Sequence, residues 1–237
     1  MIKNISIAYI ILVAFLSIFA YFFIPDNSTN ANQMHLSIHS KPPGFKVDLL
    51  LIENNIKYDQ TLFEKLFFGN KNSPTEIALQ NYNLNKHTFY YNEYGDFSAK
   101  FNNSIEIDDI NKFKSNNLIN RVFLLGTDKF GRDVLSRLVV GARISFFIGF
   151  ISVLISLIIG VFLGSLSGYY SGNVDRLIMW IINVTWSIPT LLLVIAITLA
   201  LGKGLWQVFI AVGLTMWVDV ARVVRGQVII IKERQFI

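Results

Sequence analysis

Long runs without a single charged residue are the feature that most constrains this chain. Residues 4–25 form a run of 22 uncharged residues, and residues 144–174 and 177–202 form runs of 31 and 26. A shorter run of 15 covers residues 204–218. A helix needs about 20 apolar residues to cross the hydrocarbon core of a bilayer. These runs predict transmembrane helices at residues 5–24, 144–168, 177–201 and 204–221.

Composition argues against the main soluble alternatives. The chain is 53% hydrophobic and 16% charged, whereas an ordinary soluble domain carries about 25% charged residues. High hydrophobicity argues against intrinsic disorder, and the absence of cysteine excludes a disulfide scaffold. We therefore expect an all-α polytopic membrane protein. The net charge of +5 reflects the placement of charge around the membrane and does not indicate nucleic acid as a partner.

The first apolar run could be a retained anchor or a cleaved signal peptide. Lys3 supplies the positive start that a signal peptide needs. However, the apolar stretch is longer than the usual 7–15 residues, and no small-residue cleavage pattern precedes Pro25. We expect residues 1–24 to form an N-terminal transmembrane anchor.

The basic residues near the predicted helix ends indicate a cytoplasmic N-terminus. With that orientation only Lys203 lies outside, and six basic residues lie on the cytoplasmic side, where such residues collect: Lys3, Arg176, Arg222, Arg225, Lys232 and Arg234. Residues 25–124 then form an extracytoplasmic insertion. Weak alternation at residues 88–91 and helical periodicity at residues 62–68 predict an α+β or irregular fold for it.

Motifs for catalysis or metal binding are missing from the sequence. His35 and His39 are four residues apart, which suits a metal pair on a helix, but no third ligand is in view and Pro42 and Pro43 follow. We expect a solvated loop there and no metal site. The sequence has no phosphate-binding loop, zinc-protease or serine-hydrolase motif. We predict no catalytic residue and no cofactor, and the uncharged runs argue against an ion-coupled secondary transporter.

Residues 125–143 predict an amphipathic elbow helix. Thr127 suits the N-cap, and Asp128 then lies near the positive end of the helix. Apolar residues recur at spacings of three to five, and polar residues take the other face. Such a helix is expected to lie along the outer interface and to lead into residues 144–168. A plain anchoring role and a gating or docking role are both open for it.

Two features of the predicted spans indicate specific packing. Gly160, Gly164 and Gly168 recur at four-residue intervals, which predicts close helix packing or a moving interface. Pro189 removes a backbone donor and predicts a kink in the span at residues 177–201. Polar residues near this proline could contact a passing solute or a neighbouring helix: Asn183, Ser187 and Thr190.

Residues 222–237 predict an amphipathic cytoplasmic helix after the last span. Apolar residues such as Val223 and Val224 alternate with charged ones. This segment could be a positive-inside anchor or the start of a helix that docks on a partner. Its charged residues are Arg222, Arg225, Lys232, Glu233 and Arg234.

The chain from residue 125 to residue 237 resembles the permease subunits of binding-protein-dependent ABC importers. It is most similar to the C-type subunit of the dipeptide, oligopeptide and nickel group. The resemblance rests on GTDxxGRDxxSRxxxGARxS at residues 126–145, GVFLG at 160–164, SGYYSGNVD at 167–175, IPTLLL at 188–193, ARVVRGQ at 221–227 and KERQFI at 232–237. Its elbow residues are Gly126, Thr127, Asp128, Gly131, Arg132, Asp133, Ser136, Arg137, Gly141 and Arg143.

The resemblance implies a type I ABC importer transmembrane fold with permease helices at residues 144–221. It also implies a non-enzymatic subunit in the bacterial inner membrane, transporting peptides or similar small polar solutes. The implied partners are a second permease subunit, two ATP-binding subunits or domains, an extracytoplasmic solute-binding protein and the lipid bilayer, with no nucleic acid. Asn183, Pro189 and their polar neighbours would border the solute path, and residues 222–237 would lie on the ATPase-coupling side.

Three departures from the family pattern qualify this expectation. The family commonly has Asp where this chain has Asn183 and Phe where it has Ile188. The outer insertion is longer than usual, and the sequence stops where the family's ATPase-docking loop begins, so we expect a truncated permease. The alternative function is a membrane-anchored sensor or interaction protein whose outer segment binds a ligand.

Overall fold

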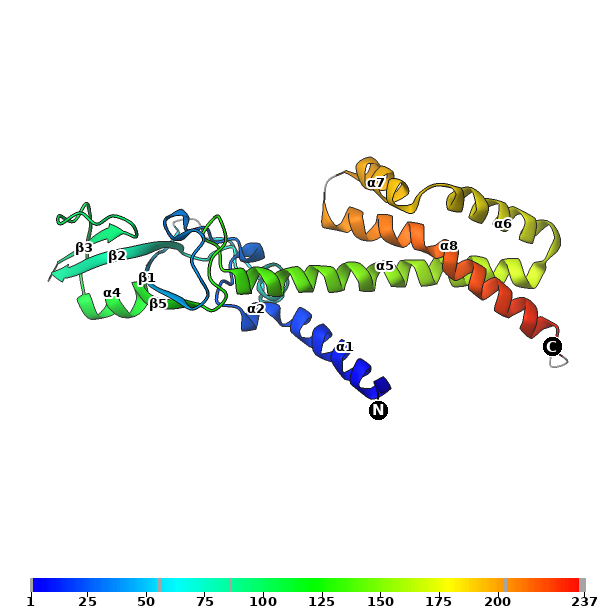
Figure 1. The fold of residues 1–237 in the computed structure, drawn as a ribbon, viewed down its shortest axis with the longest axis horizontal. Coiled ribbons are helices and arrows are strands. Elements are labelled where there is room, and N and C mark those ends of the chain that lie inside the picture. The colour runs from blue at the N-terminus through cyan, green and yellow to red at the C-terminus, as the bar shows by residue number, and fades with distance from the viewer. Residues whose placement is uncertain (1, 55–56, 86, 203, 235–237) are drawn as a thin grey trace. The chain divides into compact units, whose positions relative to one another are not determined.

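The computed structural model describes residues 2–54, 57–85, 87–202 and 204–234, and it divides the chain into two compact units (Figure 1). The first unit is Met1–Ile144 and the second is Ser145–Ile237. Lys203, which the topology prediction places in an outer turn, and residues 235–237 of the predicted coupling segment lie outside the described residues.

The first predicted span is divided into two helices, α1 (Ile2–Ile18) and α2 (Ala20–Phe23). Phe19 interrupts them with a non-helical conformation, φ −98° and ψ 21°. The apolar helix that is described, Asn4–Ile18, is shorter than a full membrane span. Two short 3₁₀ turns follow, η1 (Thr29–Ala31) and η2 (Leu36–Ile38).

The insertion is an ordered α+β domain built on a five-stranded antiparallel sheet. The strand order is β4-β3-β2-β1-β5. The strands are β1 (Phe45–Ile52), β2 (Thr75–Asn85), β3 (Thr88–Glu93), β4 (Asn103–Glu106) and β5 (Leu118–Phe123). The predicted alternation at residues 88–91 falls within β3, and the irregular insertion is ruled out.

Each face of the sheet carries a cluster of buried apolar side chains. Successive residues of a strand point to opposite faces, and Leu49 and Leu50 of β1 are both fully buried. Leu49 packs with Ile38 of η2 on one face, whereas Leu50 packs with the cluster on the other face, against which Phe113 of α4 (Ile110–Asn117) also packs. Helix α3 (Leu62–Phe68) lies between β1 and β2 in the chain and matches the predicted periodicity residue for residue.

The expected elbow helix is wrong in its first half. Residues 124–133 form a loop of turns and one isolated bridge, Thr127 to Asp133, and we call this segment the motif loop. Gly126 and Gly131 have φ of +74° and +73°, which a right-handed helix cannot contain. The helix begins only at Val134, and α5 (Val134–Tyr170) continues without a break into the predicted second span.

The second unit contains the rest of α5 and three further helices. They are α6 (Gly172–Ser187), α7 (Thr190–Leu201) and α8 (Leu205–Lys232). Helices α5 and α8 are each long and apolar enough to cross a membrane. The predicted third span is not one straight helix, because α6 and α7 meet at 94°. The described residues therefore hold two candidate spans, or three if the bent pair counts as one, instead of four.

Helix α8 is longer than the sequence pattern predicted. It runs without interruption through residues 222–232, which were expected to form a separate cytoplasmic helix. Its buried residues Trp217, Val218 and Ala221 pack with Ile178 and Ile182 of α6, and side chains of α5 complete this core. The core of the second unit is thus an α5–α6–α8 contact.

Candidate functional site

The motif loop is tied to the segment that precedes β1. The Thr127 hydroxyl donates to the Ile38 carbonyl oxygen at 2.6 Å and accepts from the Lys41 backbone nitrogen at 2.9 Å. A Cβ at Gly126 would collide with the Lys41 carbonyl oxygen. Thr127 was expected to cap a helix, but its hydroxyl instead joins two segments that are 89 residues apart.

Asp128 organises the interior of the motif loop. Its carboxylate accepts hydrogen bonds from the backbone nitrogens of Phe130 and Arg132, at 2.8 and 3.0 Å, and from the Arg132 side chain at 2.8 Å. Partial burial opposes ionisation of Asp128, but these hydrogen bonds and the charge of Arg132 outweigh it and lower the carboxyl pKa. Arg132 and Arg137 also reach Asn32, at 3.0 and 3.4 Å.

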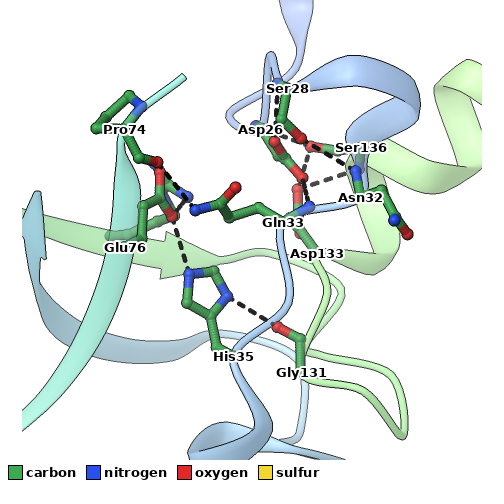
Figure 2. A network of polar contacts seen from close by, with 11 residues as sticks. Asp26, Ser28, Asn32, Gln33, His35, Pro74, Glu76, Gly131, Asp133 and Ser136 are labelled. Atoms are coloured by element: carbon green, nitrogen blue, oxygen red, sulfur yellow. Dashed lines mark hydrogen bonds and ion pairs between the residues drawn. The ribbon is translucent and has the colours of Figure 1, made fainter. Parts of the chain in front are cut away.

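Asp133 and Ser136 form the start of α5. The Asp133 carboxylate accepts from the Ser136 backbone nitrogen at 3.1 Å and also from the Ser136 hydroxyl, so Asp133 acts as the cap that was expected at Thr127. The Ser136 hydroxyl accepts from the Asp26 backbone nitrogen at 3.1 Å. Figure 2 shows this contact beside the Asp26 carboxylate, which accepts from the backbone nitrogens of Ser28 and Gln33.

A buried charged group connects the motif loop with the sheet. Figure 2 shows His35 between the Gly131 carbonyl oxygen, 3.1 Å from Nδ1, and the Glu76 carboxylate, 2.9 Å from Nε2. Arg121 of β5 binds both Glu76 oxygens, at 2.5 and 2.7 Å. A carbonyl oxygen and a carboxylate are both acceptors, so this geometry fits an imidazole that donates from both nitrogens. His35 was expected in a solvated loop and is buried; His39 is exposed as expected.

Glu76 is ionised more readily than an ordinary glutamate. Burial opposes its ionisation, but hydrogen bonds from His35 and Arg121 and the charge of Arg121 outweigh burial and lower its pKa from 4.5. A carboxyl whose pKa is lower in the folded chain than in the unfolded chain stabilises the fold. The full stabilisation is present when the pH is above the pKa of the unfolded chain. This stability is lost as the pH falls below 4.5 and through the lower folded-state pKa.

Replacing Glu76 by glutamine should therefore weaken the sheet and remove this acid dependence. Removing one partner of a buried ion pair costs about 3–5 kcal/mol, because the other charge stays uncompensated. Hydrogen exchange of the β1 and β2 amides, measured by mass spectrometry on the full chain in detergent, should show faster opening at pH 7. Glu93→Gln, at an exposed position in β3, is the matched control. Unchanged protection in the Glu76 variant would contradict this role.

Arg143 is the last charged residue of the motif and lies in α5. It is 5% exposed and donates to the Leu66 carbonyl oxygen at 2.8 Å. Its guanidinium also lies over the rings of Tyr21 and Phe67, at 5.2 and 5.1 Å. A Cβ at Gly141 would meet nothing within 4 Å, so this glycine marks no close approach.

In the second unit, the glycine face of α5 packs directly against α8. A Cβ at Gly160 would lie 2.6 Å from Val220 Cβ. At Gly164 it would lie 2.5 Å from the Ala221 carbonyl oxygen, and at Gly168 it would lie 2.8 Å from Val228 Cβ. Helix backbones approach this closely only where side chains are absent. All three glycines are therefore needed for the α5–α8 contact.

One ion pair joins three helices of the second unit. Arg225 of α8 binds both oxygens of Asp175, each at 2.6 Å, in the first turn of α6. The Ser167 hydroxyl of α5 donates to the same carboxylate. Lys232 donates to the Tyr169 carbonyl oxygen at 2.7 Å, which fixes the end of α8 to the end of α5. Glu233 and Arg234 lie just beyond α8 and are exposed.

The predicted path residues surround the bend between α6 and α7. Ile188 is extended, with φ −92° and ψ 129°, as expected for a residue before proline, and Pro189 directly precedes α7 as its N-cap residue. The Ser187 hydroxyl donates to the Val184 carbonyl oxygen at 2.7 Å. The Asn183 side chain accepts from Arg222 at 2.9 Å. Arg222 also lies 4.0 Å from the centre of the Trp186 ring.

A small pocket of about 180 Å³ lies between the bent pair and α8. Thr190 was expected on such a path from its place beside Pro189, whereas the α8 side of the pocket was not predicted. Asp219 was not predicted as a path residue, because it was considered only as the charge that ends the uncharged run at residues 204–218. Its spacing of three from Arg222 places the two residues on one face of the helix. The lining residues are Thr185, Trp186, Thr190, Leu193, Thr215, Met216, Val218 and Asp219.

No group of three or more metal-binding side chains occurs among the residues that the structure describes. In the second unit, Asp175 pairs with Arg225, and Arg222 donates to the Asn183 amide. The second unit thus contains a pocket lined by both polar and apolar side chains, a close glycine contact between α5 and α8, and an ion pair that joins α6 to α8.

Comparisons with known proteins agree with the sequence motifs. Residues 160–237 match the family described as binding-protein-dependent transport system inner membrane component. The oligopeptide transport system permease protein OppC of Bacillus subtilis (strain 168) is 40% identical over 112 residues, which cover 47% of this chain and 37% of the relative. The dipeptide transport system permease protein DppC of the same strain is 45% identical over 112 residues, 47% of this chain and 35% of the relative.

A third relative matches a longer part of the chain. The glutathione transport system permease protein GsiD of Escherichia coli O6:K15:H31 (strain 536 / UPEC) is 44% identical over 133 residues, 55% of this chain and 44% of the relative. The chain spans less than half the length of each of these relatives. Their names are those of transport components and not of enzymes. The resemblance inferred from the motifs is confirmed: residues 160–237 match the family of inner membrane components of binding-protein-dependent transport systems, and the relatives named above are permease subunits.

Proposed function

We propose that this chain is a membrane-spanning permease subunit of an ATP-driven importer for peptides or similar small polar solutes. The observation that carries the proposal is the family match at residues 160–237, which covers most of the second unit. The names of the relatives supply the substrate class, since they are permeases for oligopeptides, dipeptides and glutathione. The chain would transport and not catalyse, so ATP hydrolysis would occur on partner subunits.

The pocket beside the α6–α7 bend is the proposed part of the solute path. Its threonine hydroxyl oxygens can accept hydrogen bonds from peptide N–H groups, and the Asp219 carboxylate suits an ammonium group. Trp186 offers an aromatic face to an apolar side chain. Pro189 keeps the bend open, and Asn183 and Ser187 border it on α6.

We propose that the C-terminal part of α8 couples these helices to an ATP-binding partner. Arg222, Arg225 and Lys232 each contact α6 or α5, so a push on this end of α8 would reach both helices. Glu233 and Arg234, which follow α8, are exposed and available to a partner. The other partners would be a second permease subunit and an extracytoplasmic solute-binding protein.

The orientation proposed from the basic residues puts the N-terminus in the cytoplasm of a bacterial inner membrane protein. Helices α1 and α2 would form the anchor, and residues 25–133, with the sheet and the motif loop, would lie outside. A cysteine at exposed Ala99 should react with an impermeant reagent in intact spheroplasts. Reaction only after the membrane is permeabilised would reverse this topology.

The function is tested by isolating the protein from its own membrane. An affinity tag on the chromosomal copy should co-purify two ATP-binding proteins and a second permease. In proteoliposomes, the ATPase activity of the complex should rise when peptide-loaded binding protein is added. A tagged chain that co-purifies with a signalling protein, and without any ATP-binding protein, would favour the membrane-anchored sensor and overturn the proposal.

A further inference from the structure

Helix α3 is well formed and yet exposes large apolar side chains. Leu62, Phe63 and Phe68 are 86%, 65% and 53% exposed. The start of the helix is fixed by a capping box, in which Thr61 and Glu64 exchange hydrogen bonds of 3.2 and 2.9 Å. These side chains are therefore presented by a defined surface of the first unit.

The inner side of α3 is fixed to the ends of α2 and α5. Arg143 of α5 binds the Leu66 carbonyl oxygen and lies between the rings of Phe67 and Tyr21. At the end of α3, a Cβ on Gly69 would lie 2.7 Å from the Ser28 carbonyl oxygen, so the chain after α2 touches it directly. This places α3 where two apolar helices of the first unit meet the sheet domain.

Exposed apolar side chains also occur on α2 and α1, and the ring of Phe23 in α2 lies 6.2 Å from the ring of Phe15 in α1. Phe22 and Phe23 of α2 are 75% and 56% exposed, and Ile10 of α1 is 59% exposed. A hollow of about 290 Å³ between α2 and α3 is lined partly by Phe22, Leu62 and Leu66. We call Phe22, Phe23, Leu62, Phe63 and Phe68 the apolar rim. Contiguous apolar surface of this kind marks an interaction site.

We infer that the apolar rim is a membrane-docking surface, and that α3 inserts into the extracytoplasmic leaflet of the bilayer. The inference rests on the proposed function, because it requires α1, α2 and α5 to enter the membrane. The occupant is phospholipid and not a protein partner, because the rim is continuous with the exposed apolar side chains of α1. Aromatic residues concentrate where a chain enters the headgroup region, and apolar helix faces bind at that depth.

The arrangement gives the sheet domain a second attachment to the membrane surface. Without α3, the insertion would be held at the membrane only by its two chain connections, α2 and the motif loop. With Arg143 connecting α3 to α2 and α5, docking of the rim would hold the sheet domain in one orientation above the bilayer. Figure 1 draws β3 at the end of the sheet away from α2, so β3 serves as an internal reference.

The absence of cysteine allows a direct test on the full chain. Phe63→Cys is labelled with a nitroxide in phosphatidylethanolamine–phosphatidylglycerol vesicles, and its collisions with oxygen and with a water-soluble nickel chelate are measured. Oxygen concentrates in lipid, so the oxygen-to-nickel ratio should be several-fold higher at residue 63 than at the control Phe97→Cys. Phe97 is 81% exposed and follows β3 in the chain.

A label in α1 separates failure of this inference from failure of the proposed function. If Ile10→Cys reports lipid while residue 63 behaves like residue 97, the docking inference is overturned and the membrane proposal stands. If residue 10 also reports water, the membrane proposal itself fails. A residue 63 label shielded from both reagents would indicate protein contact and also overturn the inference. Leu62→Cys repeats the measurement without removing the Phe63–Phe67 ring stack at 4.3 Å.

Discussion

Replacing Gly164 by alanine should destabilise the second unit, whereas the same change at Gly149 should stabilise it. Both glycines lie in α5, and alanine in a helix ordinarily gains about 0.5–1 kcal/mol over glycine. At Gly164 the new Cβ would lie 2.5 Å from the Ala221 carbonyl oxygen and 2.9 Å from Val224 Cβ, whereas at Gly149 nothing lies within 4 Å. Overpacking of this kind costs about 1–3 kcal/mol.

Thermal unfolding of the full chain in detergent measures this difference. All four tryptophans lie in the second unit, and Trp217 is buried in the α5–α6–α8 core, so tryptophan fluorescence reports on the contact itself. Gly164→Ala should unfold at a lower temperature than the unchanged chain, and Gly149→Ala at the same or a higher temperature. A Gly164 variant at least as stable as the unchanged chain would show that α8 does not approach α5 here.

Replacing Asp175 by asparagine should be the most damaging loss of charge in the second unit. The change removes the negative charge and one of the two acceptor oxygens that join Ser167 of α5, α6 and Arg225 of α8. Hydrogen bonds to a charged group contribute about 1.5–3 kcal/mol each to stability when they are intact. We expect a lower unfolding temperature and, under the proposed function, weaker coupling between ATP hydrolysis and uptake. Arg225→Lys should be only partly tolerated, because lysine lacks the planar fork that binds both oxygens.

The neighbouring Arg176 provides the matched control. It is exposed and its guanidinium bonds to Asn173, three residues away, so Arg176→Gln should change stability by less than about 0.5 kcal/mol. Exchanging the two charges, with Asp175→Arg and Arg225→Asp together, should recover part of the loss. If Asp175→Asn and Arg176→Gln unfold at the same temperature, the ion pair does not hold these helices together.

Local patterns predicted several elements well. The helix at Leu62–Phe68 and the strand that contains residues 88–91 were both expected from periodicity, because each depends mainly on side chains a few residues apart. The break at Pro189 was also predictable, since proline restricts the residue before it. Its angle of 94° was not, because the direction of α7 depends on its packing against α8.

In the motif loop, the apolar spacing of the sequence predicted the wrong secondary structure. The spacing of apolar residues from Phe130 onward indicated a helix, and the motif that carries the family resemblance was recognised. The predicted helical conformation of this motif was wrong. Gly131 has a positive φ, and a Cβ at this position would collide with the carbonyl oxygen of His35, which is 96 residues away in sequence. Hydrogen bonds from Thr127 to Ile38 and Lys41 favour the loop over the helix.

Three properties could be read from the amino-acid order alone: that long apolar spans lie within α5 and α8, where α6 and α7 separate, and which family the C-terminal half resembles. They follow from hydrophobicity and steric limits that act along a few neighbouring residues. Only the folded chain revealed that His35, Glu76 and Arg121 form one buried charged group, that the glycines of α5 face α8, and that α3 stands beside α2. Each of these contacts joins segments tens of residues apart, and burial of polar groups requires such partners without specifying in the sequence which segment provides them.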